Sequence, residues 1–84
     1  MYFVYILKSL KDNKTYVGYT NSLEGRLRRH NSGQVTATKH RRPLTLLFSE
    51  ESEFSKDAKQ RELWWKSGAG RRKLKEFFQK FVSK

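Results

Sequence analysis

The chain has no cysteine and a single proline among its 84 residues. The absence of cysteine excludes disulfide bonds and thiolate metal sites, and it is consistent with a reducing cytoplasm. Long hydrophobic runs are also missing. The opening MYFVYILK becomes charged after six apolar residues and lacks the basic region and cleavage site of a signal peptide. We therefore expect a cytoplasmic protein that does not associate with membranes.

Acidic residues are scarce too, since 8 aspartates and glutamates stand against 19 lysines and arginines, for a formal net charge of +11. The excess is concentrated in two blocks. Residues 21–43 hold six basic residues and one acidic residue, and residues 66–84 hold seven and one. Such blocks favour phosphate backbones through counterion release, so nucleic acid is the expected partner. The alternative is a solvated basic surface without a partner.

The length indicates one domain over residues 1–84. Alternating β-branched and aromatic residues predict strands at 2–9, 15–20 and 44–49, with a two-residue turn at Asp12-Asn13 between the first two. Between the second and third strands, the spacing of Asn21 and Glu24 resembles a capping box that opens a helix ending near residue 31.

Two more helices are expected after the third strand. One runs from 55 to 66, and the other is a basic helix at about 71–82, after a break at residues 68–70. The last helix carries an apolar stripe of Leu74, Phe77, Phe78 and Phe81. The order β-β-α-β-α-α predicts an α+β fold, an α/β sandwich in which helices flank a three-stranded antiparallel sheet.

The predicted hairpin carries two tyrosines that could serve as core packing, as a stacking platform or as chemical groups. A two-residue turn places Tyr5 opposite Thr20 and sends Tyr5, Tyr16 and Gly18 to one face of the sheet. The tyrosines would then lie about 13 Å apart. Gly18 would leave a gap between them in which another molecule can approach the backbone.

The helices offer three further candidates. Arg26 and His30 are spaced i and i+4 on the first helix, so they share a face; an arginine can clamp a phosphate, and a histidine can relay a proton. Surface decoration is the alternative for this pair. Glu62 lies on the packing stripe of the second helix, where a carboxylate needs a partner. That partner is either a Mg²⁺ ion, which needs only one or two carboxylates, or Lys66 in an ordinary i,i+4 ion pair.

Taken together, these residues resemble the GIY-YIG nucleases, specifically the small stand-alone bacterial members. The two name-giving motifs correspond to Phe3-Val4-Tyr5 and Tyr16-Val17-Gly18, which are separated by ten residues. The similarity covers about residues 2–67 with the family's order and spacing intact. The further matching positions are Thr20, Arg26, His30, Thr38 and Glu62.

The resemblance implies a metal-dependent endonuclease that hydrolyses phosphodiester bonds in DNA, including structured or nicked DNA, or in RNA, with a place in DNA repair or recombination. It implies that Tyr5 or Tyr16 deprotonates or orients the attacking water. Arg26 would stabilise the phosphorane-like state, and His30 would position groups or relay a proton. Glu62 would hold one Mg²⁺ or Mn²⁺ ion. The expected nucleic-acid contacts are Lys14, Gly18, Arg29, Lys39, Arg41, Arg42, Arg71 and Arg72.

The chain departs from the family pattern at two places. Phe3 and Val4 replace the first motif's glycine and isoleucine, and residues 72–76 read RKLKE where several members carry a functional asparagine. The first amide after Glu62 is Gln79. The alternative function is a non-catalytic nucleic-acid-binding module that retains the fold and stacks bases on Tyr19, Trp64 or Trp65. A third is a structural partner of a large acidic assembly.

Overall fold

The computed structural model describes the backbone of residues 1–82 and the side chains of residues 1–77. Its elements follow the predicted order: β1 (Tyr2–Ser9), β2 (Thr15–Thr20), α1 (Leu23–Asn31), β3 (Leu44–Ser52), α2 (Ser55–Lys66) and α3 (Gly68–Val82). The sheet is antiparallel with the strand order β2-β1-β3, so β2 and β3 are its edges. The predicted fold class is confirmed. No helix within residues 1–82 combines the length and the hydropathy needed to cross a membrane.

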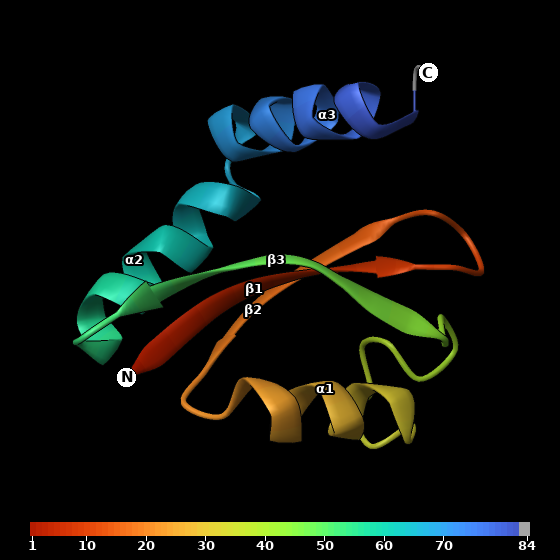
Figure 1. Ribbon diagram of the computed structural model, residues 1–84, viewed down its shortest axis with the longest axis horizontal. Helices are drawn as coiled ribbons and strands as arrows, with labels where there is room; N and C mark the ends of the chain where they lie inside the picture. Colours follow the sequence, from red (N-terminus) through yellow and green to blue (C-terminus); the bar gives the residue numbers. More distant parts are fainter. Residues whose placement is uncertain (83–84) are drawn as a thin grey trace.

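Helices cover both faces of the sheet: α1 lies on one face, and α2 with the start of α3 lies on the other (Figure 1). The strand β1 is therefore buried on both sides, and residues 4–7 are each at most 1% exposed. Because side chains alternate along a strand, β1 feeds two separate cores. Val4 and Ile6 pack with Val17, Ala58, Trp65 and Leu74, whereas Tyr5 and Leu7 pack with Leu44.

The hairpin loop differs from the prediction. The Ser9 N–H donates to the Lys14 carbonyl at 2.9 Å, which closes a loop of four residues, 10–13, in which Asn13 adopts a positive φ of 61°. The register therefore shifts by two residues, which places Tyr5 opposite Gly18 and Leu7 opposite Tyr16. A shift of two preserves parity. Tyr5, Tyr16 and Gly18 thus share a face, as predicted, but the two tyrosines lie much closer together than a two-residue turn would place them.

The start of α1 also differs from the prediction. The helix begins after Ser22, whose side chain makes no capping hydrogen bond, so the proposed Asn21–Glu24 capping box is wrong. Thr20 Oγ1 instead accepts the Ser22 N–H at 3.1 Å. Glu24 pairs with Arg28 at 3.5 Å on the exposed face of the helix. A side chain of the preceding strand, that of Thr20, thus accepts a backbone hydrogen bond at the start of α1.

The break between α2 and α3 is a single residue, Ser67, rather than residues 68–70. Gly70 belongs to α3 and is buried against α2, so closely that a side chain there would overlap the backbone of Trp64 and Trp65. Ser67 Oγ accepts the Gly70 N–H at 3.4 Å, which caps the new helix. Of the predicted α3 stripe, Leu74 is buried and Phe77 is half-buried, while the side chains of Phe78 and Phe81 lie outside the described residues, as does that of Gln79.

A carboxylate ties β3 to α2. Glu50 accepts hydrogen bonds from Arg61 Nε at 3.1 Å, from Arg61 Nη2 at 2.8 Å and from Trp65 Nε1 at 2.9 Å. The hydrogen bonds from Arg61 lower the pKa of Glu50. The strand β3 extends to Ser52, three residues beyond the prediction, and this extension brings Glu50 within reach of α2. The network was not anticipated from the sequence.

Candidate active site

Tyr5 is at the centre of a buried polar cluster between β1 and α1. Its hydroxyl lies 2.9 Å from His30 Nε2 and accepts a hydrogen bond from Arg26 Nε at 3.3 Å. Tyr5 is 1% exposed and His30 is 0% exposed. The i,i+4 spacing on α1 brings both helical residues over the same strand residue. The structure thus joins three of the sequence-predicted site residues by hydrogen bonds.

Thr38 holds the other side of the histidine ring. Its hydroxyl lies 2.8 Å from His30 Nδ1, and Thr38 is fully buried. Arg26 already donates to the Tyr5 oxygen, so the Tyr5 proton finds an acceptor when it points to His30 Nε2. The Nδ1 proton is then donated to Thr38. This arrangement satisfies each buried donor and leaves Nε2 as the accepting nitrogen of a neutral ring.

Tyr16 completes the cluster on its more exposed side. Its ring centroid lies 6.3 Å from that of Tyr5 and 5.0 Å from that of His30. The predicted separation of about 13 Å was wrong because of the register shift. The predicted gap at Gly18 is wrong as well, since a Cβ there would lie 2.5 Å from the Tyr5 hydroxyl oxygen and 3.1 Å from Tyr16 Cε1. Gly18 makes room for Tyr5 itself.

Burial shapes the electrostatics of the cluster. Burial raises the pKa of the Tyr5 phenol, and the hydrogen bond from Arg26 opposes that rise. Burial, with the positive charges of Arg26 and Arg29, lowers the pKa of His30 to about 4. The hydrogen bond to Tyr5 raises the pKa of Arg26. At neutral pH the cluster therefore holds a neutral phenol, a neutral imidazole and a guanidinium cation.

Glu62 stands close enough for its negative charge to raise the pKa of Tyr5. Its carboxylate pairs with Lys66 at 3.5 Å, and its side chain is only 15% exposed. Within residues 1–77, His, Asp and Glu side chains form no group of three that could hold a metal ion. One carboxylate fits Mg²⁺ or Mn²⁺, which retains several waters and binds substrate phosphates, but it does not fit a metal that needs a full protein cage.

The model of the family described as the GIY-YIG catalytic domain matches residues 1–75. The chain belongs to this family. It is 41% identical over 78 residues to the UPF0213 protein YazA of Bacillus subtilis, covering 92% of this chain and 76% of YazA. A UPF0213 protein of Staphylococcus haemolyticus is 40% identical over 75 residues, covering 88% and 90% of the two chains.

The fold is also similar to a solved structure, the solution NMR structure of the UPF0213 protein BH0048 from Bacillus halodurans. The two share 30% identity with a TM-score of 0.54, and the match covers 92% of this chain and 85% of the other. GIY-YIG membership indicates a nuclease family, whose members generally use a divalent metal and nucleic acid substrates. The names of these relatives state no activity.

The predicted basic contacts of this GIY-YIG chain fall into separate groups. The Arg41 side chain is hydrogen-bonded within the protein, since it donates to the Asp12 carboxylate at 3.2 Å and to the Thr15 carbonyl at 3.4 Å. Arg42 donates to the Lys39 carbonyl at 2.8 Å, and both residues line a hollow beside Pro43. Exposed Arg29 lies beside Arg26 in a second hollow. Exposed Arg72 lies on α3, and Lys14 and Arg71 line a groove between β2 and α3.

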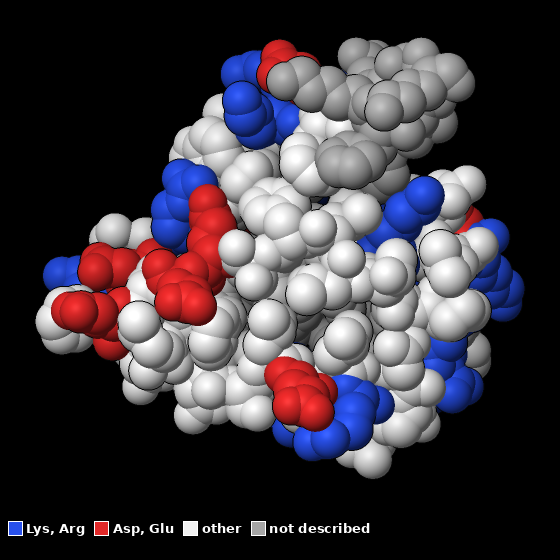
Figure 2. Space-filling model, in the orientation of Figure 1, with Lys and Arg blue, Asp and Glu red and all other residues white. Residues whose placement is uncertain are grey.

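Acidic, aromatic and basic side chains are unevenly distributed over the surface. Acidic side chains gather where β3 passes into α2, with basic side chains beside them (Figure 2). Of the proposed stacking aromatics, Trp65 is only 6% exposed and is a core residue, whereas Trp64 is 36% exposed and carries the Arg61 guanidinium 4.7 Å from its ring centroid. Lys75 was missed by the sequence reasoning, although its i,i+4 spacing from Arg71 puts both on one helix face.

Proposed function

We propose that this protein is a metal-dependent endonuclease that hydrolyses phosphodiester bonds in DNA in the cytoplasm. The observation that carries the proposal is the hydrogen-bonded cluster of Arg26, Tyr5 and His30, in a chain of the GIY-YIG catalytic domain family. Binding alone requires no buried phenol between a guanidinium and a neutral imidazole. Such a group is suited to handling a proton next to a developing negative charge.

Tyr5 and His30 form the proton path. The Tyr5 oxygen accepts a proton from the attacking water while its own proton passes to His30 Nε2, 2.9 Å away. With a pKa of about 4, His30 is neutral at working pH, so Nε2 is open to the Tyr5 proton; the same burial and positive charges disfavour the imidazolium, so the ring holds that proton only transiently. Tyr16 is the half-exposed member of the cluster and positions the water and the phosphate. A relay of this kind avoids a free phenolate, which is disfavoured in a buried site.

Arg26 stabilises the charge that builds up on the phosphate. The water oxygen forms the new bond to phosphorus, the bridging P–O bond breaks, and the leaving oxygen takes up a proton from solvent. Within the described part of the chain, the Arg26 hydrogen bond to Tyr5 uses only Nε, so both Nη groups remain for the phosphate oxygens. The same contact keeps the guanidinium oriented toward Tyr5.

Glu62 is the residue that would hold the divalent ion. When bound, Mg²⁺ or Mn²⁺ supplies charge neutralisation at the phosphate and acidifies a coordinated water. Glu62 would take this role by exchanging its Lys66 ion pair for the metal, and Lys66, whose side chain is 49% exposed, would turn toward solvent.

The test is cleavage of plasmid and of labelled single- and double-stranded DNA by the purified chain in Mg²⁺, Mn²⁺ or EDTA. We expect cleavage with metal that Arg26→Ala and Glu62→Ala lower by about 100-fold or more. Arg28→Ala is the matched control, because Arg28 is exposed on the same helix and pairs only with Glu24 among the described ion pairs. Tyr5→Phe and Tyr16→Phe separate the two phenols: loss is expected to be greater for Tyr5→Phe in the rate constant kcat.

Two results would contradict the proposal. Cleavage that survives both Arg26→Ala and Glu62→Ala would identify a contaminating nuclease. DNA binding without cleavage under any metal would leave a non-catalytic binding module as the function. The Glu62–Lys66 ion pair would then be purely structural.

A further inference from the structure

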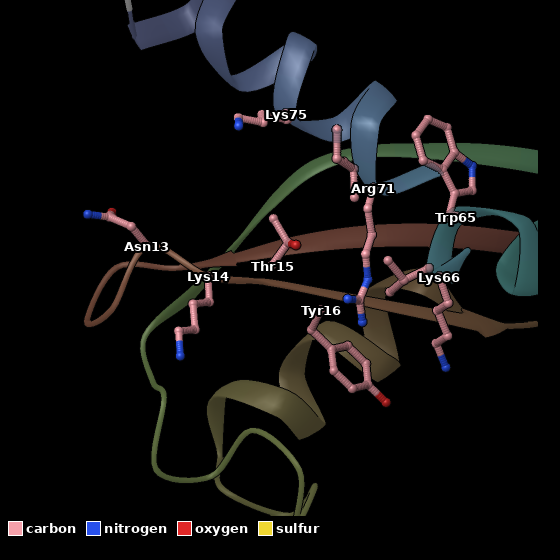
Figure 3. A pocket seen from close by; sticks show the side chains of 10 residues that line it. Asn13, Lys14, Thr15, Tyr16, Trp65, Lys66, Arg71 and Lys75 are labelled. Atoms are coloured by element: carbon pink, nitrogen blue, oxygen red, sulfur yellow. The ribbon is translucent and has the colours of Figure 1, made fainter. Parts of the chain in front are cut away.

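A groove follows the first half of the edge strand β2, bounded on its far side by the end of α2 and the start of α3. Its volume is about 670 Å³, and its walls include Lys14, Tyr16, Trp65, Lys66, Arg71 and Lys75. Figure 3 shows Lys14 and Tyr16 extending from the strand side, with Lys66 and Arg71 extending from the helices. Residues 13–17 and residues 65–75, far apart in the chain, thus form its two walls.

The lining is positively charged. Lys14, Lys66, Arg71 and Lys75 contribute four cationic side chains, and no carboxylate lines the groove within the described part of the chain. Apolar surface from Trp65 forms part of the wall. Cations without matching acids along an elongated hollow favour an extended polyanion, which releases condensed counterions when it binds.

The groove is continuous with the candidate active site. Tyr16 lines the groove and also packs 5.0 Å from His30, and Lys66 lines the groove and also pairs with Glu62. A second hollow lies at the opposite end of β2, where Arg26 and Arg29 contribute to its wall. The cluster of Tyr5, Arg26 and His30 therefore stands between two hollows along one sheet edge.

We propose that the β2–α3 groove binds the phosphodiester backbone of the substrate strand on one side of the scissile phosphate. Arg71 and Lys75 contact phosphates from the helix side, and Lys14 does so from the hairpin side. This site rests on the proposed function, since it takes the active-site cluster as the position of cleavage. Its ligand is defined by backbone chemistry, without readout of base sequence.

The test measures binding in EDTA, where metal-dependent cleavage is absent, by the fluorescence anisotropy of a labelled DNA oligonucleotide. Arg71→Gln/Lys75→Gln removes two groove cations. Lys56→Gln/Lys59→Gln removes two exposed cations from α2 that do not line the groove. We expect the groove pair to raise Kd about tenfold and to reduce the slope of log K against log salt by about 1.4–1.8, with about threefold or less for the control pair.

Each outcome bears on the groove separately from the chemistry. Equal losses for the two pairs would overturn the groove as a site and leave the proposed nuclease standing. If only the groove pair loses DNA affinity and the parent protein never cleaves DNA, the groove is supported and the proposed nuclease activity is not. No DNA binding by the parent would overturn both. Arg71→Lys/Lys75→Arg keeps both charges, so it is expected to bind like the parent, and circular dichroism confirms folding of every variant.

Discussion

The phenol of Tyr5 fills the space that a side chain at position 18 would occupy. A Cβ built on Gly18 would lie 2.5 Å from the Tyr5 hydroxyl oxygen and 2.6 Å from its Cζ. The two residues face each other across the β1–β2 ladder, so neither can move aside without breaking the pair. The glycine of the second motif is thus explained by the tyrosine of the first.

Gly18→Ala is expected to destabilise the fold by about 1–3 kcal/mol, because overpacking displaces a fully buried ring. Urea denaturation measures the loss. Tyr5→Phe removes the nearest atom, so the double variant should recover part of that loss relative to the two single variants. Gly68→Ala is the control, since nothing lies within 4 Å of a Cβ there. A Gly18→Ala protein as stable as the parent would contradict the packing described here.

His30 makes stability fall in mild acid. Its folded pKa of about 4 lies below the unfolded value of 6.5, so between these values the unfolded chain binds more protons. Stability from this group is full above pH 6.5 and falls as the pH drops toward 4, by about 3 kcal/mol in total. We expect His30→Gln to flatten the fall measured by urea denaturation at several pH values. His40→Gln, at an exposed position, should retain the parent's profile.

Thr38 is expected to hold His30 in the tautomer that accepts at Nε2. Thr38→Val keeps the shape but leaves Nδ1–H without its partner, a loss of about 1–3 kcal/mol. Thr38→Ser retains the hydroxyl and should restore most of the stability. Imidazole ¹⁵N shifts provide the second measurement, because a merely space-filling threonine would leave the tautomer of His30 unchanged in Thr38→Val.

Glu50 is expected to contribute more to stability than its neighbour Glu51. Glu50→Ala removes the acceptor of three hydrogen bonds from Arg61 and Trp65, a loss of about 1–3 kcal/mol by thermal or urea unfolding. Glu51→Ala lies at an exposed position and should change stability by about 0.5 kcal/mol or less. Equal effects would mean that the network does not attach α2 to the sheet.

The alternation of side chains was enough to predict the strands. The parity of the hairpin and the shared face of Tyr5 and Tyr16 depended on the assumed two-residue turn, and they held because the actual register differs by two residues. The register was beyond reach because Asp12 and Asn13 favour a turn of either length. The four-residue loop is established by the strand register and by the hydrogen bond from the Ser9 N–H to the Lys14 carbonyl. That shift of two residues converts a predicted gap at Gly18 into a packed contact.

Other parts of the site depend on contacts that no local pattern encodes. The i,i+4 spacing placed Arg26 and His30 on one face of α1, but their common partner, the Tyr5 hydroxyl, lies more than twenty residues away in the chain. Thr38 was identified only from the resemblance to the family, because its hydrogen bond to His30 depends on how residues 34–43 fold. The role of Gly70 was hidden as well, since a glycine that breaks a helix and one that admits a neighbouring helix look alike in sequence.

The junction at Ser67 fixes where α3 lies relative to α2. Glu62 lies on the helix before it, and Arg71 and Lys75 lie on the helix after it. Because Gly70 packs directly on the backbone of α2, the two helices cannot slide past one another. One inserted residue would turn α3 by about 100° and carry its cations off the groove. A single serine thus sets the spacing between Glu62, the proposed metal ligand, and Arg71 and Lys75, the proposed phosphate contacts.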